Sequence, residues 1–348
     1  MAEGICLSYR SWLAEHRHVL WIENTASLPQ VPEPVDEAVR VYPIAMFNQA
    51  LAPLQRGRFY PARILNSNES LPGPLMRVID LDDNQFTADF NHPLAGRECT
   101  FCSETCISHA AVSGEPAELL SWAGIDTPLA DDEVDYADSG ALARDDETAD
   151  AGFYTTPRKL LHVDGVCAGR IAAFYAEHLT AADRVLDLMA GWRSQLDDFA
   201  GDVNGLGMNA EEMADNPALQ SSLVHDLNAS PIVPFADASF AAAVNTVSIE
   251  YLTRPLAVLE EVKRILKPGG KLLITFSNRF FPPKAVALWK YLHPAERLNW
   301  VAQTVHAAGF TDIKTRVERG LQRDTADPYY PQLREMDPLF AIVADKPA

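Results

Sequence analysis

The stretch Val185-Leu186-Asp187-Leu188-Met189-Ala190-Gly191-Trp192 combines a short apolar run, an acidic side chain and a loop that contains glycine. An apolar run of this length is typical of a strand that is buried on both faces. Downstream, strand-like runs at 203–206, 223–226, 242–247 and 271–276 alternate with helical segments at 210–214 and 255–266. The alternation predicts an α/β fold with a doubly wound, mostly parallel sheet and helices on both faces.

Three further segments complete this predicted domain. Apolar residues recur at helical spacing just before the first strand and predict a helix over 163–179. The helix at 255–266 ends at Lys267-Pro268-Gly269-Gly270, a sequence that stops helices. Runs at 311–318 and 339–344 are expected to close the sheet as an antiparallel pair.

Polar side chains follow four of the predicted strands. In an open α/β sheet, ligands bind beyond the carboxyl ends of the strands, where the strand order reverses. We therefore expect one pocket to be lined by residues 187–194, 207–209, 226–227 and 245–251.

The first third of the chain has a different sequence pattern. Strand-like runs at 59–65 and 75–80 are separated by proline, glycine, asparagine and serine, and one or two helical turns are expected at 47–54. We expect a smaller β-rich domain over 1–112, an acidic linker over 113–152 and the α/β domain over 153–348.

The charge is strongly acidic and unevenly placed. The 348 residues carry 48 acidic and 29 basic side chains, a net charge of −19. Such a surface repels phosphate backbones, so nucleic acid is not an expected partner. Acidic residues are densest between Asp126 and Asp150, where we expect a solvated, self-repelling connector. A docking site for a basic partner or a lid over the active site is the alternative.

The sequence contains neither a membrane-length apolar run nor a signal-like start, so we expect a cytoplasmic protein that does not contact a membrane. Cys99, Cys102, Cys106 and His109 offer donors that zinc accepts. Strand alternation would send Cys99 to the opposite face from the other two cysteines, so reduced, packed thiols are the favoured interpretation and no metal is expected.

The landmarks of the second half resemble those of class I methyltransferases. These landmarks are the 185–192 stretch, Asp226, the run Pro234-Phe235-Ala236-Asp237-Ala238-Ser239-Phe240 and Leu266-Lys267-Pro268-Gly269-Gly270. The resemblance implies S-adenosylmethionine as cofactor. It also implies a cofactor site built from Asp187, Met189, Gly191, Trp192, Gly207, Met208, Asn209, Asp226, Leu227 and Thr246, with Asp187 and Gly191 at the amino acid end and Asp226 at the adenine.

Two positions depart from that family's pattern. Met189 and Arg193 stand where its loop carries glycines, and Gly207 stands where its ribose-binding acid is expected. Asn209 is a possible substitute for that acid. The alternative to an enzyme is therefore a binding or chaperone-like protein with a degenerate fold.

Methyl transfer needs in-line positioning and, for a hydroxyl or amine acceptor, removal of a proton. Tyr154, His162 and Tyr251 are the candidate catalytic residues, and His162 titrates near neutrality; a structural histidine is an equally good interpretation. Arg158 and Arg279 could bind a substrate carboxylate or form surface ion pairs. Glu250 and Asn278 complete the predicted substrate site. The acceptor is either a small molecule or a protein, and the oligomeric state stays open.

The first domain resembles the SlyD-like branch of FKBP-type prolyl isomerases. The resemblance depends on Phe90-Asn91-His92-Pro93-Leu94-Ala95-Gly96 and on residues 47–57. It implies an FKBP-like domain kept for substrate binding or assembly, with prolyl isomerase activity as an alternative function.

Overall fold

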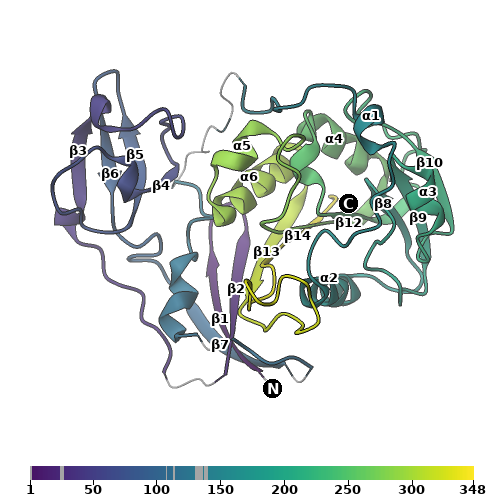
Figure 1. The fold of residues 1–348 in the computed structure, drawn as a ribbon, viewed down its shortest axis with the longest axis horizontal. Helices are drawn as coiled ribbons and strands as arrows, with labels where there is room; N and C mark the ends of the chain where they lie inside the picture. Colours follow the sequence, from purple (N-terminus) through teal and green to yellow (C-terminus); the bar gives the residue numbers. More distant parts are fainter. Residues whose placement is uncertain (1, 24–26, 107, 113, 130–135, 137–139) are drawn as a thin grey trace.

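The computed structural model describes residues 2–23, 27–106, 108–112, 114–129, 136 and 140–348. Within these ranges the strands form two sheets, one of ten strands and one of four (Figure 1). Five acidic residues of the expected connector, Asp131, Asp132, Glu133, Asp135 and Asp138, lie outside the described residues. Among the helices in the described ranges, none has the length and apolar content needed to cross a membrane.

The large sheet contains the predicted parallel core. Its strands are β1 (Ala2–Arg10), β2 (Glu15–Ile22), β7 (Thr100–Cys106), β8 (Arg184–Leu188), β9 (Asp202–Gly207), β10 (Ser221–Val224), β11 (Phe240–Thr246), β12 (Leu266–Phe276), β13 (Thr311–Arg319) and β14 (Leu339–Asp345). They lie in the order β10-β9-β8-β11-β12-β14-β13-β2-β1-β7. The run from β10 to β12 is parallel, and β14 is antiparallel to β12 and β13. The predicted doubly wound fold and its closing antiparallel pair are confirmed.

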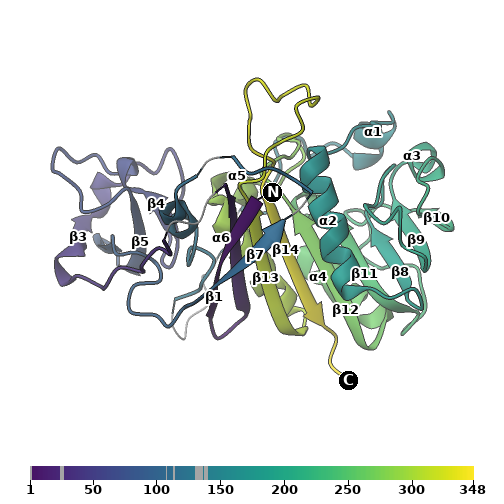
Figure 2. The ribbon, with the colours of Figure 1, turned by 90° about the horizontal axis from the view of Figure 1, so that it is seen from below.

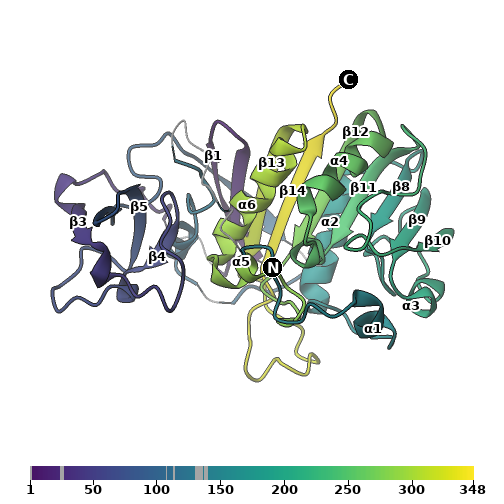
Figure 3. The same cartoon turned by 90° about the horizontal axis from the view of Figure 1, so that it is seen from above.

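Helices cover both faces of this sheet (Figures 2 and 3). One face carries α2 (Gly165–His178), which begins at Asp164, whose side chain accepts two backbone N–H groups. The other face carries α4 (Pro255–Ile265), α5 (Ala287–Tyr291) and α6 (Pro294–Ala307). Side chains alternate between the two cores as strand geometry requires: Val185 belongs to the α2 core and Leu186 to the α4 core. The short helices α1 (Asp150–Tyr154) and α3 (Ala210–Ala214) flank the carboxyl ends of the strands.

The N-terminal third contributes to both sheets. β2 pairs parallel to β13, and β1 pairs antiparallel to β2 and to β7, so the hairpin extends the large sheet. The four-stranded antiparallel sheet has the order β3-β6-β5-β4 and its own apolar core. Its strands are β3 (Val39–Pro43), β4 (Phe59–Pro61), β5 (Leu75–Leu81) and β6 (Gln85–Asp89). Strands from the first 112 residues therefore belong to the same sheet as the strands that follow residue 153.

The helix expected at 47–54 does not form. The backbone makes a single three-ten turn at Ile44–Met46 and then a turn at 49–51. The side chain of Asn48 accepts the N–H of Ala50 at 3.2 Å, a local bond that competes with helix formation. Pro53 also lacks the N–H that a continuing helix would need.

Candidate active site

An open cavity lies beyond the carboxyl ends of β8, β9, β10 and β11, with about 1100 Å³ of space that includes open solvent. The strand order reverses between β8 and β11, so the cavity occupies the position expected for a ligand in this fold. The residues predicted to be catalytic or to bind the cofactor all line it: Tyr154, His162, Asp187, Met189, Gly191, Trp192, Gly207, Met208, Asn209, Asp226, Leu227, Thr246 and Tyr251. Their individual roles stay predictions.

Asp187 is fixed at the end of β8 by a chain of hydrogen bonds. Its carboxylate accepts the hydroxyl of Ser194 at 2.5 Å, and the Ser194 oxygen accepts the amide of Asn216 at 2.8 Å. Burial raises the pKa of Asp187 to about 7, because desolvation disfavours the charged form and outweighs the Ser194 hydrogen bond. A cationic ligand group would favour the ionised carboxylate, so Asp187 is suited to hold an amine.

The loops after β8 and β9 touch through their backbones. The N–H of Ala190 donates to the carbonyl of Leu206 at 2.9 Å. A Cβ atom at Gly207 would lie 2.1 Å from the carbonyl oxygen of Ala190, a distance that no side chain tolerates. The family's ribose acid is missing from position 207 because the first loop occupies its space. Met189 adopts φ 64°, so it takes the left-handed conformation that glycine usually supplies.

Asn209, the possible substitute for the missing acid, has its amide engaged. Its Oδ1 accepts the N–H of Glu212 at the start of α3, and its Nδ2 donates to the carbonyls of Tyr154 and Thr155. Glu212 is a carboxylate of the cavity wall that the sequence analysis missed. Its Oε1 accepts the N–H of Arg158 at 2.6 Å, and its Oε2 lies 3.3 Å from where a Cβ of Gly191 would be.

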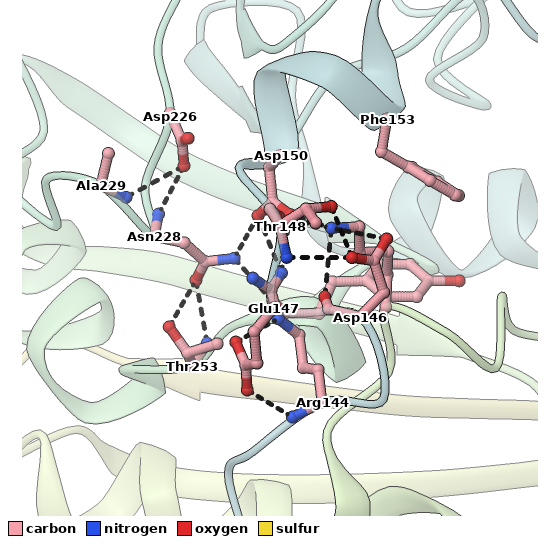
Figure 4. Close-up of polar contacts among 12 residues, drawn as sticks. Arg144, Asp146, Glu147, Thr148, Asp150, Phe153, Asp226, Asn228, Ala229 and Thr253 are labelled. Atoms are coloured by element: carbon pink, nitrogen blue, oxygen red, sulfur yellow. Dashed lines mark hydrogen bonds and ion pairs between the residues drawn. The ribbon is translucent and has the colours of Figure 1, made fainter.

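Asp226 and Leu227 form the wall after β10. The Oδ1 atom of Asp226 accepts the backbone N–H groups of Asn228 and Ala229 at 2.9 and 3.0 Å (Figure 4). These two bonds fix the carboxylate at the cavity without a cationic partner among the described residues. The position fits the hydrogen-bonding role that the methyltransferase resemblance implies.

A covering segment, residues 140–163, runs from the acidic stretch across the cavity and contributes Asp150, Tyr154 and residues 160–163 to its lining. Asp150 is buried, and its two carboxylate oxygens accept from the Nη1 atom of Arg144 at 2.7 and 2.9 Å; it also accepts the side-chain amide of Asn228 at 2.8 Å (Figure 4). The fully buried ammonium of Lys284 contacts Asp150 and donates to the carbonyl of Thr148 at 2.7 Å. The expected solvated connector is wrong for Asp150, and for Asp126, which is buried against two histidines. None of these partners was found from the sequence, because each pairing depends on the fold.

Aromatic rings form the end of the cavity nearest the covering segment. Tyr251 stacks on Phe281, and its hydroxyl accepts the N–H of Phe281 at 2.8 Å. The ring of His162 meets Phe281 edge-on at 5.5 Å between centroids. Part of the side chain is exposed to solvent, but desolvation by the surrounding protein, followed by repulsion from Arg279 and Arg158, lowers the pKa of His162. The imidazole is therefore neutral at pH 7 and able to accept a proton.

The four residues predicted to bind substrate do not line the cavity. Arg158 lies 4.1 Å from the centre of the Phe153 ring and donates to the carbonyl of Phe153. Arg279 pairs with Asp337 at 3.5 Å and stacks on Tyr329. Glu250 is fully buried behind Tyr251, and Asn278 follows β12. The cavity thus presents no free cation for a substrate carboxylate from Arg158 or Arg279.

The charges of the cavity wall fit S-adenosylmethionine. The lining contains four carboxylates, from Asp150, Asp187, Glu212 and Asp226, and one guanidinium, from Arg193. The cofactor carries an amino group, a sulfonium, two ribose hydroxyls and an adenine amine, all of which are cationic or hydrogen-bond donors. It also carries one carboxylate, and Arg193 is the guanidinium in the lining, where it stacks on Trp192 and donates to the carbonyls of Trp192 and Asp215.

Comparison with known proteins identifies the domain. The methyltransferase domain family matches residues 165–274. A demethylmenaquinone methyltransferase of Renibacterium salmoninarum is 29% identical over 113 residues, which is 31% of this chain and 48% of the relative. The chain therefore spans about half the length of this curated relative.

Solved structures also match part of the chain. A possible histamine N-methyltransferase of Thermotoga maritima is 17% identical, covers 52% of this chain and 88% of its own, and gives a TM-score of 0.39. Phosphoethanolamine N-methyltransferase 2 of Haemonchus contortus is 14% identical, with 52% of each chain covered and a TM-score of 0.36. The family match places a methyltransferase domain at residues 165–274, which include the strands β8 to β11 whose carboxyl ends surround the cavity.

Proposed function

We propose that this protein transfers the methyl group of S-adenosylmethionine to a small molecule bound in the strand-end cavity. The observation that carries the proposal is the set of charged groups in the cavity: the carboxylates of Asp187, Glu212 and Asp226 and the guanidinium of Arg193 lie at the carboxyl ends of the central strands. When bound, the cofactor supplies a methyl group made electrophilic by its sulfonium. The work of the protein is then to hold the two reactants in line and to accept a proton.

Each part of the cofactor has a proposed partner. Asp187 would hold the amino group, and Arg193 the carboxylate. Asp226 would bind the adenine amine, as the family resemblance implies. Glu212 would take the ribose hydroxyls, because Gly207 has no room for a side chain while Glu212 reaches the same wall from α3.

The acceptor would enter the aromatic end, where Tyr154, His162, Tyr251 and Phe281 line the cavity. A small molecule is favoured over a protein segment because residues 140–163 cover the cavity and are anchored by the buried Lys284. The walls are aromatic and the two nearby arginines are engaged elsewhere, which supports a neutral or cationic acceptor over an anionic one.

The small sheet would serve assembly of the enzyme. Arg58, fully buried beside β4, lies 3.7 Å from Glu296 of α6 and donates to the carbonyl of Tyr291, and the N–H of Phe59 also donates to Glu296. These contacts attach the sheet to the methyltransferase helices. A cytoplasmic location is proposed with it, supported by the free cysteines 6, 99, 102 and 167.

Calorimetric titration with S-adenosylmethionine and S-adenosylhomocysteine tests the proposal. We expect micromolar binding that Asp187→Ala and Asp226→Ala each weaken by tenfold or more, about 1.4 kcal/mol. Asp202→Ala is the matched control, because Asp202 begins β9 at the opposite edge of the sheet and is half exposed. Absence of binding to the intact protein would mean that the crowded loops after β8 and β9 have closed the site.

A further inference from the structure

Glu250 is a buried carboxyl group whose surroundings do not satisfy it. The residue is fully buried in the turn after β11, and no described group forms a hydrogen bond of normal geometry with either carboxylate oxygen; its own backbone N–H and the Tyr251 hydroxyl are the donors that act on it. Burying such a group without a partner costs free energy, so its presence calls for a reason other than stability. Strained or unsatisfied groups of this kind cluster at functional sites.

The neighbourhood of Glu250 contains three other titratable groups. Tyr251 follows it in the chain, Tyr154 faces it from α1, and Arg297 faces it from α6. Arg297 is itself buried and donates its Nε to the carbonyl of Trp289 at 2.8 Å. It influences Glu250 through space without forming an ion pair with it. Both tyrosines line the cavity, so Glu250 lies one side chain away from it.

The hydroxyl of Tyr251 can accept a proton from one group and donate its own proton to another. One lone pair accepts the N–H of Phe281 at 2.8 Å. This leaves the second lone pair for a donor in the cavity and the hydroxyl proton for Glu250, its polar neighbour on the buried side. Hydrogen bonds of such groups are often long in the free enzyme and shorten when substrate binds.

We propose that Glu250 receives, through the hydroxyl of Tyr251, the proton that the methyl acceptor releases. The inference depends on the proposed methyl transfer and specifies its acceptor as a molecule whose nucleophilic oxygen or nitrogen carries a proton. As the bond from this atom to the methyl carbon forms, the sulfur–carbon bond of the cofactor breaks and sulfur keeps the electron pair. The proton of the acceptor passes to Tyr251, and the Tyr251 proton passes to the Glu250 carboxylate, which later returns it to solvent.

The proposal predicts a pH dependence that differs from the one expected of His162. Burial raises the pKa of Glu250 to about 8, and Arg297 and Tyr251 oppose that rise. A base must be ionised to work, so the rate should rise with pH with a midpoint near 8. For His162, whose pKa is lowered from its ordinary value, the midpoint of the rise should lie below about pH 6.5.

Infrared titration of the full-length protein tests the pairing without any acceptor. We expect a carboxylic acid band that disappears with a midpoint near pH 8, is missing in Glu250→Gln and remains in Asp187→Asn, the variant that removes the carboxyl group titrating near pH 7. Tyr251→Phe should move the midpoint upward, because the tyrosine hydroxyl stabilises the ionised form. Glu296→Gln is the matched control, a second fully buried glutamate that lies against the small sheet, and it should keep the band. A wild-type protein without the band, or a midpoint that Tyr251→Phe leaves unchanged, would overturn the proposal.

Single-turnover transfer from methyl-labelled S-adenosylmethionine tests the relay itself, with phenol, benzylamine and thiophenol as probes. For phenol and benzylamine, we expect Glu250→Gln and Tyr251→Phe each to lower the rate on the order of 100-fold and to flatten its pH dependence. The double variant should be no slower than either single variant. Thiophenol, already a thiolate at neutral pH, should be insensitive to both changes. A wild-type pH profile in Glu250→Gln, or one lost only in His162→Asn, would refute the relay. Calorimetry distinguishes failure of the relay from failure of the proposed function. If the cofactor binds normally and Glu250→Gln does not change the transfer rate, only the relay is refuted. If the cofactor does not bind, the proposed function is refuted.

Discussion

The loop after β8 and the loop after β9 contact each other at the cavity, and each has an unexpected residue at that contact. One has methionine where glycine is expected, and the other has glycine where an acid is expected. The first carries Met189 in a left-handed conformation, φ 64°, where a glycine is the easy choice. The second ends in Gly207, where the family resemblance leads one to expect an acid. Both departures arise at one contact, because the backbone of Ala190 lies against Gly207.

The comparison teaches that a glycine can be required by a neighbouring loop as well as by a ligand. From the sequence, the two positions are 18 residues apart and resemble independent losses from a cofactor site. In the structure, the space that an acidic side chain would occupy at 207 belongs to the first loop. Glu212 of α3, five positions later in the chain, is a carboxylate that lines the cavity beside this loop.

Placing an acid at position 207 should disrupt the contact between Gly207 and Ala190. Of the changes considered, it should lower the free energy of unfolding the most. Gly207→Asp places a Cβ 2.1 Å from the carbonyl oxygen of Ala190 and 3.0 Å from the sulfur of Met213. We expect the free energy of unfolding to fall by about 3 kcal/mol or more, since backbone cannot move aside as a flexible side chain can. Urea denaturation measures this. Gly169→Asp is the control, because a Cβ there meets no atom within 4 Å. A stable Gly207→Asp variant with tighter cofactor binding would mean that the two loops are independent.

Asp187, at the start of the loop after β8, should make the free energy of unfolding depend on pH. Its pKa of about 7 in the folded protein lies above the ordinary value near 4, so the folded state binds the proton more tightly than the unfolded chain. The free energy of unfolding should therefore fall by a few kcal/mol as pH rises from about 4 to 7. We expect Asp187→Asn to remove the part of this fall that belongs to Asp187 and to leave the part that the buried Glu250 contributes up to about pH 8.

Binding of S-adenosylhomocysteine should have the opposite sign, strengthening up to tenfold per pH unit below about 7, because the amine needs the ionised carboxylate. Denaturation curves and calorimetry at several pH values test both slopes. Affinity that is independent of pH in the wild-type protein would contradict an amine partner for Asp187.

Met189→Gly tests the loop after β8 and should change stability and cofactor affinity the least. Glycine relieves about 1–2 kcal/mol of left-handed strain but adds about 0.5–1 kcal/mol of chain entropy and removes apolar contacts. We expect the free energy of unfolding to change by less than about 1 kcal/mol and cofactor affinity by less than tenfold. Gln195→Gly, at φ 55° in the same loop, provides the parallel case. A loss above about 2 kcal/mol in thermal or urea unfolding would show that the Met189 side chain is a packing element.

Much of the second half follows from its sequence because local pattern and fold agree there. The strand at 184–188 and the helices at 165–178 and 255–265 lie within two residues of their predicted limits. Periodicity, the capping Asp164 and the stop at Pro268-Gly269 all act locally. The positions that follow each strand also meet as expected, because parallel strands end at one edge.

What the sequence does not disclose depends on contacts between distant segments. Lys284 finds its acidic partners 134 to 138 residues earlier in the chain. Arg158 and Arg279, predicted to hold a substrate carboxylate, are instead engaged by aromatic rings and by Asp337. A charged residue near a predicted pocket does not reveal whether its partner is a ligand or another part of the chain.

The N-terminal hairpin has a consequence for how the chain is made. β2 pairs with β13, and His16 of β2 contacts Thr315 of β13 across a separation of 299 residues. During synthesis the hairpin leaves the ribosome long before its partner strand exists, so the large sheet is completed only after most of the chain has been translated. Contacts of such range slow folding, and until they form, an unpaired strand edge is open to other nascent chains. Deleting residues 2–22 to isolate the methyltransferase domain would make that exposed edge of β13 permanent.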